Sequence, residues 1–169
     1  MNRFRSTFNF ALSLALCVGF VPHAYSQTKV LSKEVIAANR ELDQRLMAAH
    51  ALKDAAMVQS LFSVSPDVFF IDPTGHMTKG SSSIRHEWAT WFDTLETIRG
   101  DIQDISYIPA GEGVIGVGTV IYTRKPKNAP ADQKTVIWTD YRRIENGKWV
   151  YLFRHAHWPL HDRNPRKAP

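Results

Sequence analysis

The sequence predicts one α+β domain in which helices come first and a long antiparallel sheet follows. Between residues 33 and 52, apolar side chains recur every three or four positions, which is the spacing of one helix face. After Gly100 the period changes to two in four successive segments, which is typical of half-buried strands. Helices followed by antiparallel strands indicate α+β packing.

The first residues are typical of a secretory signal peptide. Two arginines precede an apolar stretch over residues 8–20, and Ala24-Tyr25-Ser26 offers small residues at both positions that an exporting peptidase reads. Residues 1–26 are therefore the predicted signal, with cleavage after Ser26. The apolar stretch is shorter than the roughly 20 residues that span a bilayer, so we expect a periplasmic or secreted protein and no membrane partner.

Cys17 is the only cysteine of the chain and lies inside this predicted signal. A lipid anchor on Cys17 is an alternative, but bulky Leu16 stands where a small residue precedes a modified cysteine. After cleavage the predicted domain, residues 27–160, has no cysteine, so packing must stabilise it without disulfides.

The charge pattern argues against a nucleic-acid-binding protein. Of the formal charge of +5, +2 lies in the predicted signal and +3 in residues 154–169, so the body between them is neutral. A nucleic-acid binder would carry its basic side chains as a patch on one face. Here the excess lies at the end of the chain, where residues 161–169 form a predicted basic, proline-containing tail.

The first predicted helix covers residues 33–52, with Ser32 as its N-terminal cap. Its apolar stripe consists of Val35, Ala38, Leu42, Leu46, Ala49 and Leu52. A shorter second helix begins after Asp54, whose carboxylate can accept from the free amides of the first turn, and ends before Pro66.

A short hairpin and a third helix are expected next. Residues 67–72 read DVFFID, a β-branched and aromatic run, and the turn Asp72-Pro73-Thr74-Gly75 reverses the chain at His76. Serines 81–83 offer capping hydroxyls to the third helix, and we expect Gly100 to end it. The apolar face of that helix consists of Ile84, Trp88, Trp91 and Leu95.

Four strands complete the predicted sheet, over residues 101–108, 114–123, 135–144 and 149–157. The pieces between them at 111–113 and 145–148 are short enough for hairpins. Residues 125–132 contain two prolines and suit a longer loop between antiparallel strands.

Several motifs together give the chain a family resemblance that covers residues 33–159. They are Lys53-Asp54 before a short helix, the DVFFIDPTG hairpin, Gly80 before a tryptophan-bearing helix, and the closing segment RRIENGKWVYLFRHAHWP. With these motifs the chain resembles the SnoaL-like branch of the nuclear transport factor two-like (ketosteroid isomerase-like) superfamily. The resemblance implies a cone: a curved, mostly antiparallel sheet wrapped around a long N-terminal helix, three helices in all, and an apolar pocket at one end.

The resemblance leaves the function open. Proteins on this frame include ketosteroid isomerases, polyketide cyclases, dehydratases, epoxide hydrolases and non-enzymatic association domains, so the site must decide. Members usually carry a serine two positions after the histidine of the closing strand, here His155. This chain has His157 in the place of that serine, which puts any ligand role of the serine in doubt.

The last strand carries side chains that we predict to face the pocket. Alternation puts Trp149, Tyr151, Phe153, His155 and His157 on one face. The two histidines would lie about 6.6 Å apart along the strand, close enough to share a ligand. A metal would need a third converging donor, so we assign no metal site and no cofactor. The structural alternative is one histidine bonded inside the cone and the other at its rim.

Asp72 and His155 are the predicted catalytic pair. A carboxylate beside an imidazole raises the pKa of the ring and fixes its tautomer, which gives a base suited to proton transfer next to a carbonyl. Such a pair would serve a cofactor-independent isomerase, cyclase or dehydratase. The structural alternative is that Asp72 only caps its own turn.

Aromatic side chains predict the kind of ligand. The predicted ligand contacts are Trp88, Trp91, Trp138, Tyr141, Phe153 and His157. Flat aromatic surface favours a small apolar or aromatic molecule, although core packing is the alternative for the tryptophans. A further alternative is an association module without a ligand. In either case we expect a homodimer through the outer sheet face, where Asp140 and Arg142 would add charge to apolar residues.

Overall fold

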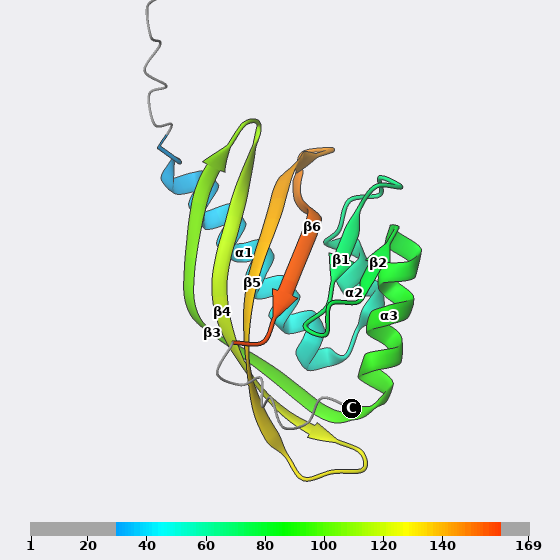
Figure 1. The fold of residues 1–169 in the computed structure, drawn as a ribbon. Coiled ribbons are helices and arrows are strands. Elements are labelled where there is room, and N and C mark those ends of the chain that lie inside the picture. The colour runs from blue at the N-terminus through cyan, green and yellow to red at the C-terminus, as the bar shows by residue number, and fades with distance from the viewer. Residues whose placement is uncertain (1–29, 160–169) are drawn as a thin grey trace, which may run out of the picture.

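The computed structural model describes residues 30–159, which form three helices and a six-stranded sheet (Figure 1). The predicted α+β class is therefore confirmed. The predicted signal peptide, residues 1–26, and the predicted basic tail, residues 161–169, lie outside the described residues. Within residues 30–159, no helix is both long enough and apolar enough to cross a membrane.

Both predicted N-terminal caps of the first two helices are present. Helix α1, Lys33–Leu52, begins where the Ser32 hydroxyl accepts from a backbone amide of the first turn at 3.3 Å. Helix α2, Ala55–Ser60, begins where the Asp54 carboxylate accepts from such an amide at 2.8 Å. Each cap satisfies an amide that has no partner inside its helix, and such caps contribute about 1 kcal/mol.

Helix α3, Ser81–Asp93, differs from the prediction at both ends. Its N-cap is Gly80 rather than a serine, so the predicted hydroxyl cap is wrong. The prediction that Gly100 ends the helix is also wrong, because Gly100 lies inside the first long strand. A Cβ at Gly100 would meet the side chains of Met47 and Tyr122 at 2.5 and 2.8 Å. Glycine is needed there for close packing and not for a helix end.

The sheet has the strand order β2-β1-β6-β5-β4-β3. Its strands are β1 Phe69–Ile71, β2 Met77–Lys79, β3 Leu95–Ala110, β4 Gly113–Pro126, β5 Asp132–Glu145 and β6 Lys148–His157. Neighbours pair antiparallel except β1 and β6, which run parallel. The hairpin and the four closing strands are confirmed, but β3, β4 and β5 run further than their periodicity predicted.

The long strands curve around helix α1, which crosses the inner face of the sheet (Figure 1). Leu42, Leu46 and Ala49 of the helix are buried against inward side chains of the sheet such as Val120 and Trp138. Burial of a leucine side chain of this kind contributes about 1.5–3 kcal/mol, so the helix stripe and the inner sheet face stabilise each other.

A bulge in β6 decides which of its side chains face inward. In the pairing with β5, Tyr151 and Phe153 lie opposite consecutive residues, so Leu152 is the extra residue. A one-residue insertion moves all later side chains to the other face of the strand. Tyr151 is buried before the bulge, and Arg154 and Ala156 are buried after it.

The predicted pocket face of β6 is therefore wrong beyond Tyr151. Phe153, His155 and His157 lie on the outer face of the sheet, where the Phe153 ring stacks on Phe69 with centroids 5.4 Å apart. The rings of His155 and His157 are 5.5 Å apart on that outer face. The predicted alternation of faces fails here because it assumes that β6 pairs with β5 without a bulge.

Candidate functional site

A cavity of about 250 Å³ lies between helix α3, the β1–β2 hairpin and the inner faces of β4, β5 and β6. Its apolar lining includes Phe70, Trp88, Trp91, Tyr122, Val136, Ala156 and Trp158. Its polar lining includes Asp72, Thr74, Glu87, Arg124, Lys134 and Arg154. Arg154 is only 4% exposed, whereas the other charged lining residues are accessible. The cavity thus combines aromatic walls, a charged rim and one enclosed cation.

An aromatic cluster under helix α3 forms one wall. Trp88 stacks on His50 of α1 with ring centroids 4.5 Å apart and contacts Phe70 and Trp91 at 5.2 and 5.3 Å. Aromatic pairs at such separations contribute about 0.5–1.5 kcal/mol each beyond the area that they bury. Trp88 and Trp91, two of the predicted ligand contacts, therefore line the cavity and stabilise the fold at the same time.

His50 is fully buried behind this wall in its neutral form. Its Nδ1 lies 3.0 Å from the hydroxyl of Tyr122, a cavity-lining residue. Burial, together with the positive charge of Arg154, lowers the pKa of His50 to about 3. Burial also raises the pKa of Tyr122, so its hydroxyl stays protonated. His50 and Tyr122 therefore form a neutral hydrogen-bonded pair and add no charge to this wall of the cavity.

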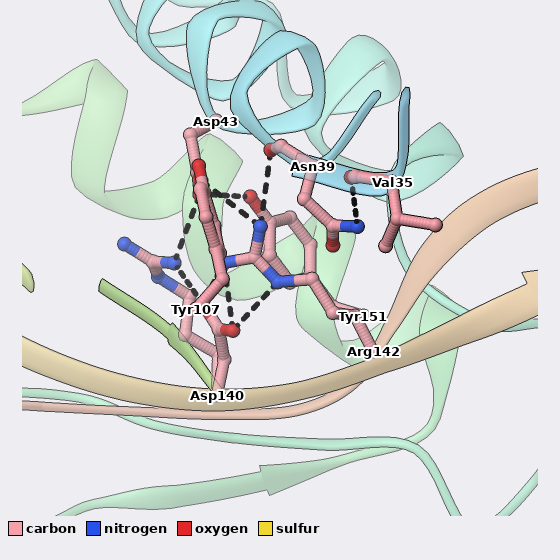
Figure 2. A network of polar contacts seen from close by, with 8 residues as sticks. Val35, Asn39, Asp43, Tyr107, Asp140, Arg142 and Tyr151 are labelled. Carbon is pink, nitrogen blue, oxygen red and sulfur yellow. Dashed lines mark hydrogen bonds and ion pairs between the residues drawn. The ribbon is translucent and has the colours of Figure 1, made fainter. Parts of the chain in front are cut away.

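A buried ion network ties helix α1 to the sheet (Figure 2). Arg142 of β5 donates to both oxygens of Asp140 at 2.8 Å and to both oxygens of Asp43 at 2.9 and 3.1 Å. A further bond of 3.1 Å runs from Arg142 to the backbone carbonyl of Asn39. Bidentate arginine–carboxylate pairs are strong because charge and geometry both match.

Two tyrosines complete the surroundings of Asp43. The hydroxyls of Tyr107 and Tyr151 each donate to its carboxylate at 2.8 Å (Figure 2). Burial, and next the charge of Asp43, raises the pKa of both hydroxyls, so they remain donors. The Arg142 guanidinium lies 4.9 Å from the Tyr151 ring centre, within the range of a cation–π contact.

Arg154 connects this network to the cavity. Its Nη1 donates to Asp140 at 2.7 Å and lies 4.0 Å from Asp43, while its guanidinium lies 4.8 Å from the ring centre of Trp138. Burial raises the pKa of Asp140, but three N–H donors from the two arginines support its ionised form. The network therefore holds a positive side chain at the inner surface of the cavity.

Asp72 lines the cavity rim, but its own turn uses its carboxylate. Oδ1 accepts from the Thr74 amide at 2.8 Å, from the Thr74 hydroxyl at 2.7 Å and from the His76 amide at 2.9 Å. This is the turn-capping role that was the structural alternative. Within residues 30–159, no hydrogen bond or ion pair joins Asp72 to the outward-facing His155, so the structure does not bring the predicted catalytic pair together.

The other predicted ligand contacts lie away from the cavity. Tyr141 faces outward and donates to the Ala110 carbonyl at 3.5 Å, and Phe153 and His157 share that outer face. Trp138 faces inward but is fully buried in contact with Arg154. In the part of the chain that the structure describes, no three potential metal-ligating side chains converge.

The predicted site did not include the polar residues on which the observed site depends, which are Asp43, His50, Asp140, Arg142 and Arg154. A usable signal was present, because Asn39, Asp43 and His50 are spaced so that they share the buried side of α1. A polar residue on a buried stripe needs a partner inside the protein. Searching for those partners would have pointed to the alternating charges of β5.

The comparison with known families agrees with the fold. A family model described as the SnoaL-like domain matches residues 44–152, which is more than half of the chain. The chain belongs to the SnoaL-like domain family. The predicted SnoaL-like membership is confirmed, and the predicted nuclear transport factor two-like fold agrees with the solved structures. No curated protein matches the chain.

Solved structures share the SnoaL-like fold at low identity. An NTF2-like superfamily protein from Salmonella enterica is 20% identical with a TM-score of 0.70, covering 75% of this chain and 92% of that one. A candidate dehydratase from Streptomyces avermitilis is 16% identical, with a TM-score of 0.68 and coverages of 75% and 97%. A candidate aromatic ring hydroxylase from Novosphingobium aromaticivorans is 16% identical, with a TM-score of 0.70 and coverages of 78% and 93%. Identities this low establish the fold alone.

Arg142→Met is expected to lower the free energy of unfolding by about 3–5 kcal/mol, because Asp43 and Asp140 lose the cation that compensates their burial. The matched control is Arg143→Met, next to it in β5. Its side chain is 44% exposed and pairs with Glu145, so the loss should stay below about 1 kcal/mol. Urea unfolding followed by circular dichroism measures both, and equal losses would contradict the role of the network.

His50 predicts a pH dependence of stability. The folded chain keeps His50 neutral down to a pKa of about 3, whereas an unfolded histidine titrates near 6.5, so the unfolded chain binds the proton first. The stability linked to His50 is complete above pH 6.5 and is lost as the pH falls toward 3, at up to about 1.4 kcal/mol per pH unit.

The variant that tests this linkage is His50→Gln, which should flatten the change in unfolding free energy between pH 7 and pH 5. Tyr122→Phe is the control, because it removes the hydrogen bond but leaves His50 buried, and it should keep the wild-type slope. Urea titrations at several pH values give the slopes. An unchanged slope in His50→Gln would show that the histidine is not held neutral.

Proposed function

We propose that the mature, exported chain binds a small ring-bearing molecule in the aromatic cavity. The observation that carries this proposal is the cavity itself, about 250 Å³ in volume and walled by Phe70, Trp88 and Trp91. Ligand sites are typically apolar hollows with a few well-placed polar groups. Drug-sized ligands occupy roughly 300–1,000 Å³, so this cavity suits a molecule of one or two rings.

Binding is better supported than catalysis by the predicted acid–base pair. Asp72 is engaged by its turn and His155 faces the opposite side of the sheet, so a carboxylate and an imidazole do not converge on a ligand in the cavity. An isomerase, cyclase or dehydratase on this frame would have to use other groups. The names of the candidate dehydratase and the candidate hydroxylase describe those proteins only.

The outer face of the sheet supports the proposed pairing of two copies. The outward side chains of β4 and β5 are uncharged over most of their length and only partly exposed: Ile115, Val117, Thr119, Ile121, Ile137, Thr139 and Tyr141. Asp140 and Arg142, which we considered for this face, point inward, so the outer face carries less charge than the sequence suggested. A broad uncharged sheet face of this kind favours association with a second copy.

The binding proposal predicts that the neutral probe 2-naphthylmethanol binds with a Kd of roughly 10–100 µM, as expected for a ligand of about 12 non-hydrogen atoms. Ala156→Leu, which fills the cavity, should weaken binding at least about tenfold. The control is Thr135→Leu, on the outward side of β5 next to Val136. Isothermal titration calorimetry on the mature chain measures all three, and a wild type that binds neither this probe nor its carboxylate and ammonium analogues would refute the proposal.

The pairing proposal predicts that the mature chain sediments as a dimer in analytical ultracentrifugation. Ile137→Lys places a charge in the middle of the outer face and should shift the dissociation constant at least about tenfold toward monomer. Val64→Lys is the control, since Val64 is 82% exposed in the loop after α2. A monomeric wild type, or equal dissociation of both variants, would argue against this interface.

A further inference from the structure

We propose that the ligand carries a carboxylate and that Arg154 binds this group inside the cavity. The inference rests on the proposed function, since it names the chemical class of the molecule that the cavity would hold. Aromatic walls surround a single enclosed guanidinium, so the fitting ligand is a flat apolar acid of one or two rings.

Arg154 has unused donors for such a group. Its side chain is 4% exposed and its Nη1 donates to Asp140 at 2.7 Å. Among the contacts within residues 30–159, no hydrogen bond is formed by its Nε or Nη2. A guanidinium is a planar fork of five N–H donors, and a carboxylate can accept two of them side by side. Neither Nε nor Nη2 is among the fully buried, unpartnered polar atoms of the described residues, so water reaches both, and a bound carboxylate would take the place of that water.

The carboxylates of Asp43 and Asp140 make fewer hydrogen bonds with Arg154 than they make with Arg142. Asp140 accepts two of its three hydrogen bonds from Arg142 and only one from Arg154. Asp43 accepts from Arg142 and from two tyrosines, and its nearest oxygen is 4.0 Å from Arg154. Positive potential thus remains on the side of Arg154 that borders the cavity. Enclosure strengthens the attraction of an anion there, because little water screens it.

The charged side chains at the cavity rim are less suited than Arg154 to bind the carboxylate of a ligand. Arg124 lines the rim on β4, but its guanidinium already pairs with Asp132 at 2.6 and 2.9 Å. Lys134 is exposed, so water weakens its attraction for an anion. The rim on the helix side carries the carboxylate of Glu87, which disfavours a second anion there. A ligand acid would therefore place its charge inward on Arg154 and its ring against Trp88 and Trp91.

Three naphthalene probes of similar size test the inference on the wild-type chain: 2-naphthoate, 2-naphthylmethanol and 2-naphthylmethylammonium. At pH 7.5 and low salt, calorimetry should show the carboxylate binding at least about tenfold more tightly than the alcohol, with the ammonium weakest. An alcohol that binds as tightly as the carboxylate overturns the inference and leaves the proposed function standing. If none of the three probes binds, the proposed function fails as well.

Variants assign the effect to one side chain. Arg154→Met should remove the preference for the carboxylate while the alcohol affinity stays within about threefold, because the apolar walls are kept. Arg124→Met is the matched rim control and should keep the preference. A preference that survives in Arg154→Met, or that is lost in Arg124→Met, places the anion at the rim and overturns the inference.

Arg154→Lys provides a second variant in case Arg154→Met does not fold, which circular dichroism would reveal. Lysine keeps the charge but lacks the planar fork, so the carboxylate preference should fall by about threefold or more without vanishing. A carboxylate affinity in Arg154→Lys equal to that of the wild type would show that the guanidinium does not bind the group.

Discussion

The contact of Arg142 with Asp43 and Asp140 is the constraint on which the rest of the structure depends. A buried guanidinium is tolerated only when carboxylates neutralise its charge and accept its hydrogen bonds. Here helix α1 supplies one carboxylate and strand β5 the other. The helix cannot slide or rotate over the sheet without leaving a charge unpaired in the core. Gly116 of β4 makes this arrangement possible, because a Cβ there would collide with both Arg142 and Asp140.

The same constraint positions the cation of the proposed ligand site. On one side of the network, tyrosine hydroxyls satisfy Asp43, and on the other side Arg154 extends toward the aromatic wall. That wall has its own support, since Trp88 is stacked on the buried His50. For the proposed binding function, both the cation and the aromatic surface are in place without a ligand, and preorganisation of this kind lowers the entropic cost of binding.

Much of the fold could be predicted because its signals are local. The caps at Ser32 and Asp54 and the turn at Asp72 are decided within a few residues, and all three are present. Features set by distant contacts could not be predicted in the same way. Strands β4 and β5 continue past the core to a point where Arg124 and Asp132 lie opposite each other and form an ion pair. Gly100 was wrongly predicted to end a helix, because the reason for a glycine at this position is the Tyr122 side chain, which lies on another strand.

The site was predictable on the helix and not on the last strand. Trp88 and Trp91 follow from helical spacing, which no insertion interrupts in α3. In β6 the bulge at Leu152 becomes visible only when the strand is paired with β5. Because the predicted alternation continued through Leu152, it placed the histidines on the inner face and Arg154 on the outer face. The pairing of charges predicts the faces of β6 better than the two-residue period does. An arginine among apolar strand residues calls for a carboxylate at the opposite position, and the residue opposite Arg154 is Asp140. Matching these two charges first places Arg154 inside, and the face of every residue after the bulge follows from it.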